Sequence, residues 1–160
     1  MQNLLRAPKR VSARPEAGLL QDGHHDALDN IAVIAADLLG APVALVSLVT
    51  SDQQYAAGGN PGAAARGLMA SLPLSDSFCK HVVADALPLV VEDARIDPRV
   101  CSIPSVGTLG IVAYLGVPLQ LESGEVLGSL CVIDFEPRIW TESQQRGMER
   151  LARTTMTEIR

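Results

Sequence analysis

The chain has 160 residues, enough for one domain with a substantial core, and 48% of them are hydrophobic. Its apolar runs are short, and none approaches the roughly 18 uninterrupted apolar residues that a membrane-spanning helix requires. A formal net charge of −5 argues against nonspecific attraction to nucleic acid, which needs a basic protein surface. We therefore expect one domain that works in the cytoplasm and contacts neither a membrane nor nucleic acid.

Residues 1–21 are expected to be a flexible leader, because they contain two prolines and no sustained periodicity. Their basic residues are scattered, and the apolar core of a secretory signal is missing. The folded domain is then expected to cover residues 22–160. Within it the spacing of apolar residues over Asp26–Leu39, followed by Gly40, predicts an amphipathic helix that ends at the glycine.

The valine-rich run Pro42–Thr50 is too short for a second long helix and predicts a strand that is covered on both faces. We place this strand in the middle of an antiparallel sheet, flanked by Gly128–Asp134. Gln53–Ala57 is predicted to return beside it. The small and turn-forming residues of 58–70 then predict a mobile loop.

A short helix is predicted next, with Ser75 or Asp76 as its cap. Leu89–Glu92 predicts another short strand, and residues 101–110 are interpreted as a loop. The predicted helix carries four residues that face a common interior: Phe78, Cys79, Val82 and Val83.

Two apolar runs within Ile111–Asp134 are joined by a turn that contains Gly124, which predicts an antiparallel hairpin. Each strand of the hairpin includes small or polar residues that are unusual in a pure core. Such residues on one face are typical of a ligand pocket, which combines apolar walls with a few polar groups. For each residue alone, the alternative is simple packing, since a buried cysteine is usually an inert small hydrophobe. These residues are Tyr114, Gly116, Ser129 and Cys131.

Thr141 and Gln144 have the spacing of a capping box and predict a last helix that runs to Ile159. We expect this helix to lie beside the helix at Asp26–Leu39. Both helices show more apolar positions than one contact with the sheet needs, so together they predict a homodimer interface that includes Met148 and Leu151. The alternative is that both apolar stripes pack on their own sheet in a monomer.

Three segments carry a resemblance to a known family: G-S-L-C-V-I-D, S-L-P-L-S-D-S-F-C-K-H and L-V-V-E-D-A-R-I-D-P-R. They resemble the bacterial GAF domain, a regulatory module that senses small molecules, over residues 24–158. The resemblance implies an α+β fold with a central antiparallel sheet of five to six strands. It also implies that the amphipathic helices from both termini cover one face, with short helices and loops on the other.

The expected ligand site lies between the short helix and the hairpin, closed by the loop 58–70. Its residues are Phe78, Cys79, Val82, Val83, Tyr114, Ser129 and Cys131. We expect a sensor that binds a small molecule, dimerises, or does both, and that acts on an output domain or signalling partner. The ligand and any cofactor stay unidentified, because the chain lacks the cyclic-nucleotide signature of the family and the adjacent Cys-His pair of its bilin-binding members.

No catalytic or metal-binding residues are predicted. Cys79 and His81 are two positions apart on a helix and point roughly 200° from one another, so they do not form a nucleophile and its base. The three cysteines show no C-x-x-C pair, and the adjacent residues His24 and His25 lack a third metal ligand. Two alternatives remain open: a thiol-based enzyme resembling free methionine-R-sulfoxide reductase, and a purely structural dimerisation module.

Overall fold

The computed structural model describes residues 26–159, and the predicted leader, His24 and His25 lie outside this range. The strands are β1 (Val43–Val49), β2 (Gln53–Gly59), β3 (Leu72–Pro73), β4 (Leu89–Val91), β5 (Ala113–Gln120) and β6 (Val126–Asp134). The helices are α4 (Asp26–Leu39), α5 (Pro61–Ala65), α6 (Cys79–Asp85), α7 (Pro104–Thr108) and α8 (Glu142–Ile159), and a 3₁₀ turn, η1, covers Leu74–Asp76.

The strands form one sheet in the order β3-β2-β1-β6-β5-β4, and every neighbouring pair is antiparallel. β1 and β6 lie in the middle, and every residue of β1 is buried. The valine-rich sequence of β1 explains this position, because a strand covered on both faces needs apolar side chains in both directions. The predicted place of residues 42–50 beside 128–134 is therefore confirmed.

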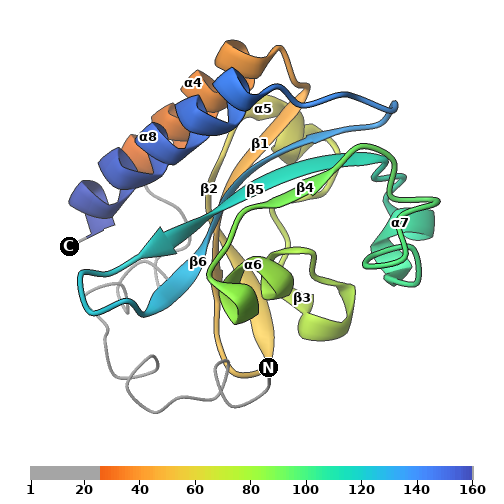
Figure 1. Ribbon diagram of the computed structural model, residues 1–160, viewed down its shortest axis with the longest axis horizontal. Coiled ribbons are helices and arrows are strands. Elements are labelled where there is room, and N and C mark those ends of the chain that lie inside the picture. The colour runs from red at the N-terminus through yellow and green to blue at the C-terminus, as the bar shows by residue number, and fades with distance from the viewer. Residues whose placement is uncertain (1–25, 160) are drawn as a thin grey trace.

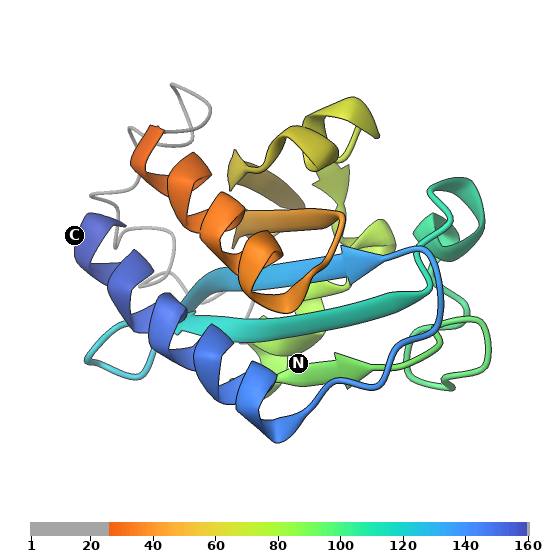
Figure 2. The same ribbon diagram turned by 90° about the horizontal axis from the view of Figure 1, so that it is seen from above.

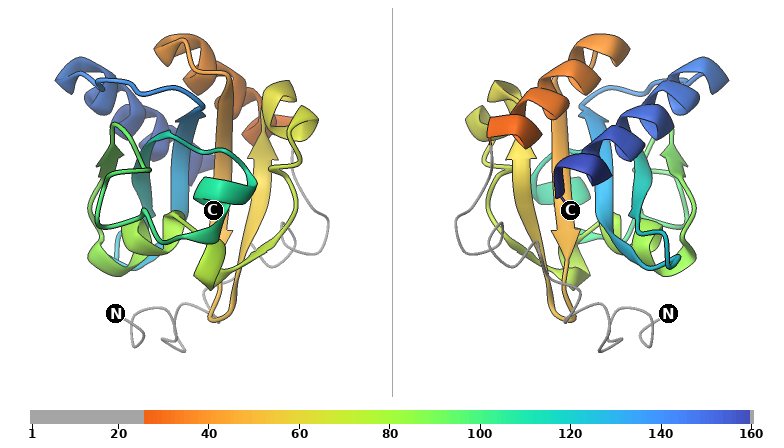
Figure 3. Two further views of the ribbon diagram at one scale, coloured as in Figure 1. Left: turned by 90° about the vertical axis from the view of Figure 1, so that its right-hand side faces the viewer. Right: turned by 90° about the vertical axis from the view of Figure 1, so that its left-hand side faces the viewer.

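The two long helices cover one face of the sheet, and the short helices lie on the other (Figures 1 and 3). α4 and α8 contact each other and run side by side, α4 over β2 and β1 and α8 over β5 and β6 (Figure 2). Beneath them lies a core that includes Leu28, Ile31, Leu115, Leu130 and Met148. A second core fills the opposite side, between the sheet and α6. The predicted fold class is confirmed.

α4 approaches β2 closely because β2 carries a glycine at the point of contact. A Cβ atom on Gly58 would lie only 2.6 Å from the backbone carbonyl carbon of Leu28. Real Cβ atoms do not come so near to other atoms, so a larger residue would push the helix away from the sheet. The buried side of α4, including Ile31 and Ala35, can thus reach the first core.

α8 begins at the predicted capping box. Gln144 donates its backbone N–H to Thr141 Oγ1 over 3.1 Å, and Thr141 donates its N–H to Gln144 Oε1 over 2.9 Å. Just before this box, the indole of Trp140 donates a hydrogen bond to the carbonyl oxygen of Val91, over 2.9 Å. These contacts fix where α8 starts and join it to the edge of the sheet.

Two segments predicted as loops contain short helices. In 58–70, Gly58 and Gly59 complete β2, and α5 follows with Asn60 as its cap. Asn60 Oδ1 accepts a hydrogen bond from the N–H of Ala63 over 3.0 Å, and Pro61 occupies the first helical position. In 101–110, α7 likewise starts at a proline, Pro104. The prediction was wrong at these helices because small residues hide the periodicity of such short elements.

The predicted cap of α6 was also wrong. Ser75 and Asp76 belong to η1, and α6 begins at Cys79. Ser77 instead accepts a hydrogen bond on its hydroxyl oxygen from the N–H of Lys80, over 3.2 Å. The turn inserted before the helix moves the capping role to Ser77.

Candidate functional site

The seven predicted site residues come together on the face of the sheet that is opposite α4 and α8. In the β5–β6 pairing, Cys131 lies across from Gly116 and Ser129 lies across from Pro118. Alternate residues of a strand share a face, so Tyr114 points to the same side as both. α6 packs against this face. All seven side chains are buried: Phe78, Cys79, Val82, Val83, Tyr114, Ser129 and Cys131.

A chain of polar contacts crosses this otherwise apolar core. The hydroxyl oxygen of Tyr114 lies 3.1 Å from Cys79 Sγ and 3.3 Å from Ser129 Oγ. The ring of Tyr114 also packs against that of Phe78, with the ring centroids 5.1 Å apart. Tyr114 therefore links α6 to both strands of the hairpin.

The position of the Tyr114 ring depends on Gly116. The ring folds back along its own strand, and a Cβ atom on Gly116 would come within 2.6 Å of Tyr114 Cε1. Only a residue without a side chain leaves that space free. This explains the glycine that interrupts the apolar sequence of β5.

Two of the thiols influence each other. The pKa of Cys79 is lowered to about 7, mainly by hydrogen bonding from the Cys131 thiol. Burial opposes this shift, and a hydrogen bond with the Tyr114 hydroxyl adds to it. The pKa of Cys131 is raised well above its usual value by its interaction with Cys79 and by burial. Burial and the charge on Cys79 also raise the pKa of Tyr114. A single negative charge at Cys79 is thus stabilised by two protonated donors.

Ser47 adds a polar group that sequence reasoning missed. It lies opposite Ser129 in the β1–β6 pairing and is fully buried. Its hydroxyl makes no hydrogen bond of regular geometry within residues 26–159, although it helps to lower the pKa of Cys79. The signal was present in the sequence, because Ser47 is the only polar residue of Val43–Val49. We interpreted the run as uniform core and gave that serine no weight.

The space around these groups is small. A cavity of about 20 Å³ lies against Phe78, Cys79, Tyr114 and Cys131, which is room for about one water molecule. Val82, Val83 and Ser129 do not line it and belong to the surrounding core. Leu68 also lines it and belongs to the segment 58–70 that we expected to close the site. The remaining lining was not predicted: Leu45, Gln54, Leu72, Asp76, Ser105, Ile111 and Ile133.

Other predicted features stay outside this cavity. His81 is half-buried on α6, and burial lowers its pKa, with a smaller contribution from the charge of Lys80. Asp93 and Asp97 each pair with the arginine two positions later, and each accepts a hydrogen bond from that arginine's backbone N–H. Residues 26–159 contain no cluster of three metal-ligating side chains.

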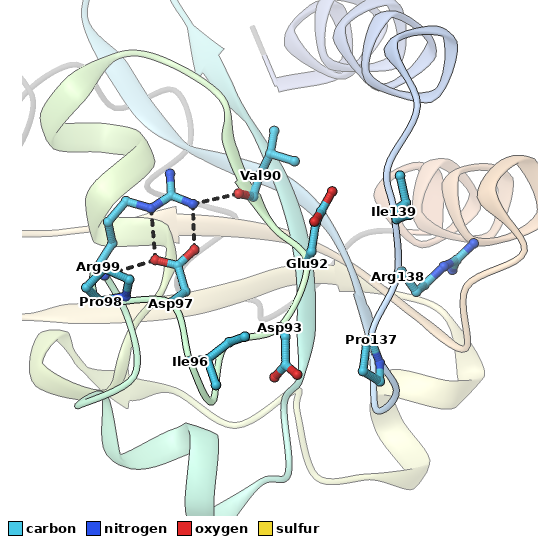
Figure 4. Close-up of a pocket in the computed structure, with 10 residues that line it drawn as sticks. All are labelled: Val90, Glu92, Asp93, Ile96, Asp97, Pro98, Arg99, Pro137, Arg138 and Ile139. Atoms are coloured by element: carbon cyan, nitrogen blue, oxygen red, sulfur yellow. Dashed lines mark hydrogen bonds and ion pairs between the residues drawn. The ribbon is translucent and has the colours of Figure 1, made fainter.

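A second, larger hollow of about 920 Å³ lies between the turn after β4 and the segment that leads to α8 (Figure 4). It is an open groove on the surface, and Ile96 and Ile139 on its two sides are each 79% exposed. The carboxylate of Asp97 in its wall is occupied by Arg99, at 2.6 Å. Sequence reasoning did not predict this groove, because the residues that line it are separated by about forty positions and form no common motif.

The outer edge of β4 runs along this groove and is covered by groups from the neighbouring loops. Arg99 donates to the carbonyl oxygen of Val90 over 2.7 Å (Figure 4). The indole N–H of Trp140 donates to the carbonyl oxygen of Val91. The backbone N–H of Arg138 donates to the carbonyl oxygen of Glu92 over 3.1 Å. Three successive carbonyls at the end of the sheet are therefore engaged.

A six-stranded antiparallel sheet with two long helices on one face and an enclosed polar cluster on the other defines the architecture of this small α+β domain. The family model of the GAF domain matches residues 23–159. The chain belongs to the GAF family, as its sequence motifs suggested. Among curated proteins it is 35% identical over 147 residues to the cyclic di-GMP phosphodiesterase PA2567 of Pseudomonas aeruginosa. That match covers 90% of this chain and 24% of the relative, so the chain spans about a quarter of the relative's length.

Solved structures show the same fold at lower identity. The GAF domain of a phosphoenolpyruvate-protein phosphotransferase from Acinetobacter matches with a TM-score of 0.68 and 20% identity, over 91% of this chain and 90% of that one. The free methionine-R-sulfoxide reductase of Neisseria meningitidis matches with a TM-score of 0.63 and 19% identity, over 82% and 75%. The second GAF domain of DevS from Mycobacterium smegmatis matches with a TM-score of 0.61 and 18% identity, over 82% and 89%. None of the helices in residues 26–159 is long and apolar enough to cross a membrane.

Proposed function

We propose that this GAF domain is a sensor without catalytic activity of its own, and that its input is a small molecule bound at the Tyr114 cluster. The observation that carries the proposal is the chain of polar contacts from Ser129 through Tyr114 to Cys79, enclosed by apolar side chains. Apolar walls with a few placed polar groups are the usual composition of a ligand site. The buried hydroxyl of Ser47, which makes no regular hydrogen bond within the described part of the chain, adds a further group that a ligand can satisfy.

Binding at this site requires the protein to move. A cavity of about 20 Å³ holds no metabolite, so the residues that cover it from the chain between α5 and α6, Leu68, Leu72 and Asp76, must shift first. A ligand that binds only the shifted form stabilises that form. The change in conformation is then the signal, and an output domain or signalling partner reads it.

The site geometry favours a sensor over an enzyme. The side chains that lower the pKa of the Cys79 thiol are Cys131, Tyr114 and two serines. Asp76, the carboxylate that lines the same cavity, is not among them. A thiol enzyme activated by a general base usually has that base within hydrogen-bond reach of its nucleophile. The low pKa of Cys79 nevertheless keeps a reductase as the second candidate, and consumption of free methionine-R-sulfoxide in the presence of dithiothreitol tests it directly.

A ligand screen by thermal denaturation tests the sensor proposal. Purines, amino acids, haem and biliverdin are added separately to the wild type, to Tyr114→Phe and to Tyr55→Phe. We expect at least one compound to raise the melting temperature of the wild type and of Tyr55→Phe, and to raise that of Tyr114→Phe much less. Tyr55→Phe is a matched control because it removes the same atom from a tyrosine that does not line the cavity. An equal shift in all three proteins would contradict the assignment of the site.

We also propose that the domain dimerises through α4 and α8. Two large aliphatic residues one helical turn apart on α4, Ile34 and Leu38, are 51% and 55% exposed beside α8. Met148 is fully buried in the core of its own domain, so its predicted place in the interface was wrong. Leu151 is half-buried and packs at the edge of that core.

Sedimentation of charged variants tests the dimer. Ile34→Glu combined with Leu38→Glu places two charges on the exposed stripe, and we expect a dimer to become monomeric while its circular dichroism stays unchanged. Leu87→Glu is the control, because Leu87 is 62% exposed and follows α6 on the opposite side of the sheet. A monomeric wild type throughout the concentration range would reject the proposal.

A further inference from the structure

We propose that Cys79 and Cys131 form a reversible disulfide when the protein meets a hydroperoxide, so that this pair is an oxidative modification site in the core of the domain. The inference does not depend on the proposed ligand. It rests on where the fold places two cysteines that are 52 positions apart in the sequence.

The two thiols meet in one enclosed space. Cys79 is the first residue of α6 and Cys131 is in the central strand β6, and both line the same cavity of about 20 Å³. Each thiol also shifts the pKa of the other, as two groups that border one small cavity would. The two side chains are 2% and 1% exposed. The third cysteine, Cys101, is exposed and does not line the cavity, so it does not compete for either partner.

The surroundings give the two sulfurs different roles. Cys79 has a pKa of about 7, so a large fraction of it is thiolate near neutral pH, which is the form that attacks a peroxide. Cys131 has a raised pKa and keeps its proton. Tyr114 also stays protonated and lies 3.1 Å from Cys79 Sγ, where its hydroxyl can donate to the thiolate. Cys79 is therefore the residue that is oxidised first, and Cys131 is the residue that resolves the product.

The reaction consumes one hydroperoxide and gives two molecules of water when the oxidant is hydrogen peroxide. The Cys79 thiolate attacks one peroxide oxygen, the O–O bond breaks, and the departing hydroxide takes up the thiol's former proton from solvent to become water. This leaves a sulfenic acid on Cys79. Cys131 sulfur then attacks Cys79 sulfur, the S–O bond breaks, and the Cys131 proton leaves with the hydroxide as the second water. Two thiols are oxidised by two electrons, and the peroxide is reduced.

The rate at which Cys79 is oxidised depends on how readily a peroxide enters the cavity. The cavity has room for about one water molecule, so a peroxide reaches Cys79 only when the covering residues Leu68 and Leu72 move aside. We therefore expect oxidation to be slower in the folded protein than at an exposed thiol. Once formed, the disulfide joins α6 to the middle of the sheet and removes the thiolate from Tyr114.

Peptide mapping of the peroxide-treated protein tests the inference. The starting protein is Cys101→Ser, which contains only the two buried cysteines. After peroxide treatment we expect the mass of this variant to fall by two hydrogens and a disulfide-linked peptide that contains Cys79 and Cys131 to appear. Dithiothreitol should then restore both thiols completely. In a Cys131→Ser background, a sulfenic acid should accumulate on Cys79 and be trapped by dimedone. In a Cys79→Ser background, Cys131 should stay reduced at the same dose.

The exposed thiol of the wild type separates a failed oxidation experiment from a buried pair that does not react. The wild type supplies an internal standard, because its exposed Cys101 reports that the oxidant is active. The inference is overturned if Cys79 and Cys131 both stay reduced in folded Cys101→Ser at a peroxide dose and time far beyond those that oxidise Cys101 completely in the wild type. It is also overturned if Cys131 is oxidised in the absence of Cys79. Circular dichroism of each variant before treatment shows that the thiols are compared in the folded state.

Discussion

At the scale of single residues, the unusual feature is a tyrosine whose hydroxyl is fully buried and whose ring rests over a glycine. Tyr114 contacts Cys79 and Ser129 at hydrogen-bond distance, and Gly116 leaves the space that the ring occupies. A buried hydroxyl is tolerated in a core only when it finds partners, since an unsatisfied one costs about 1–3 kcal/mol. Tyr114 and its partners thus depend on one another.

Gly116→Ala should therefore destabilise the domain. The added methyl group overlaps the Tyr114 ring, and overpacking of this kind costs about 1–3 kcal/mol. Urea denaturation measures the change in the free energy of unfolding. The matched control is Gly107→Ala in α7, where a Cβ atom would meet nothing within 4 Å. We expect no loss of stability there, and equal losses in both variants would contradict the role of Gly116.

The lowered pKa of Cys79 predicts a pH dependence. Between about 7 and the usual value of 9.0, the unfolded chain holds a proton on this thiol that the folded protein has already released. The free energy of unfolding should therefore rise with pH across that window, and this contribution should be lost as the pH falls through about 7. Above the window, the raised pKa of Cys131 acts in the opposite direction.

Urea denaturation at several pH values checks this expectation. Cys79→Ser should lose the rise, whereas Cys101→Ser should keep it, because Cys101 is exposed and does not line the cavity that holds the thiol pair. An unchanged slope in Cys79→Ser would show that another group is responsible.

The sequence was informative about which residues meet, and less so about the space between them. Tyr114, Ser129 and Cys131 could be placed on one face because strand periodicity is strict and the turn at Gly124 sets the pairing. The size of the cavity could not be predicted, because it depends on how Leu68 and Leu72 fold over the sheet from a segment without periodicity. Ser47 was overlooked for a simpler reason, namely that apolar neighbours dominate its strand.

At the scale of elements, local signals predicted the long helices well and the five-residue helices poorly. α8 was predictable because its capping box precedes several turns of regular apolar spacing. α5 gives no comparable spacing, and its signal is only a cap and a proline at Asn60 and Pro61. Short helices are defined by their ends, so a search for periodicity alone overlooks them.

The capping box of α8 should contribute measurably to stability. Thr141→Ala removes the hydroxyl that accepts the N–H of Gln144, and loss of such a cap costs about 1 kcal/mol. Thr157→Ala is the control, since Thr157 is exposed within the same helix and only donates to the carbonyl oxygen of Arg153. Thermal or urea denaturation compares the two variants. A cost for Thr157→Ala as large as that for Thr141→Ala would indicate a general loss of helix stability.

At the scale of the whole molecule, the sheet has a protected centre and two short outer strands. β1 and β6 are covered on both faces, whereas β3 contains two residues and β4 contains three. Local stability follows burial and hydrogen bonding, so it should fall from the centre outward. The apolar sequences of the two central strands predicted their place in the sheet and explain it.

Hydrogen exchange should follow the same order. We expect the amides of Leu45 to Leu48 and those of Leu130 to Val132 to exchange last, and those of β3 to exchange much earlier. Exchange measured by NMR or mass spectrometry resolves these segments. Early exchange in β1 would be incompatible with a central strand and would call the strand order into question.

The covered edge of β4 has a consequence for how the protein behaves at high concentration. A bare outer strand is a template on which a strand of another molecule can add, and repeated addition leads to fibrils. Here Arg99 and Arg138 already occupy the carbonyl oxygens of Val90 and Glu92, which lie two residues apart and so point to the same side of the chain. The segment that leads into α8 thus has a second task besides starting a helix, which is to keep the sheet from growing beyond one molecule.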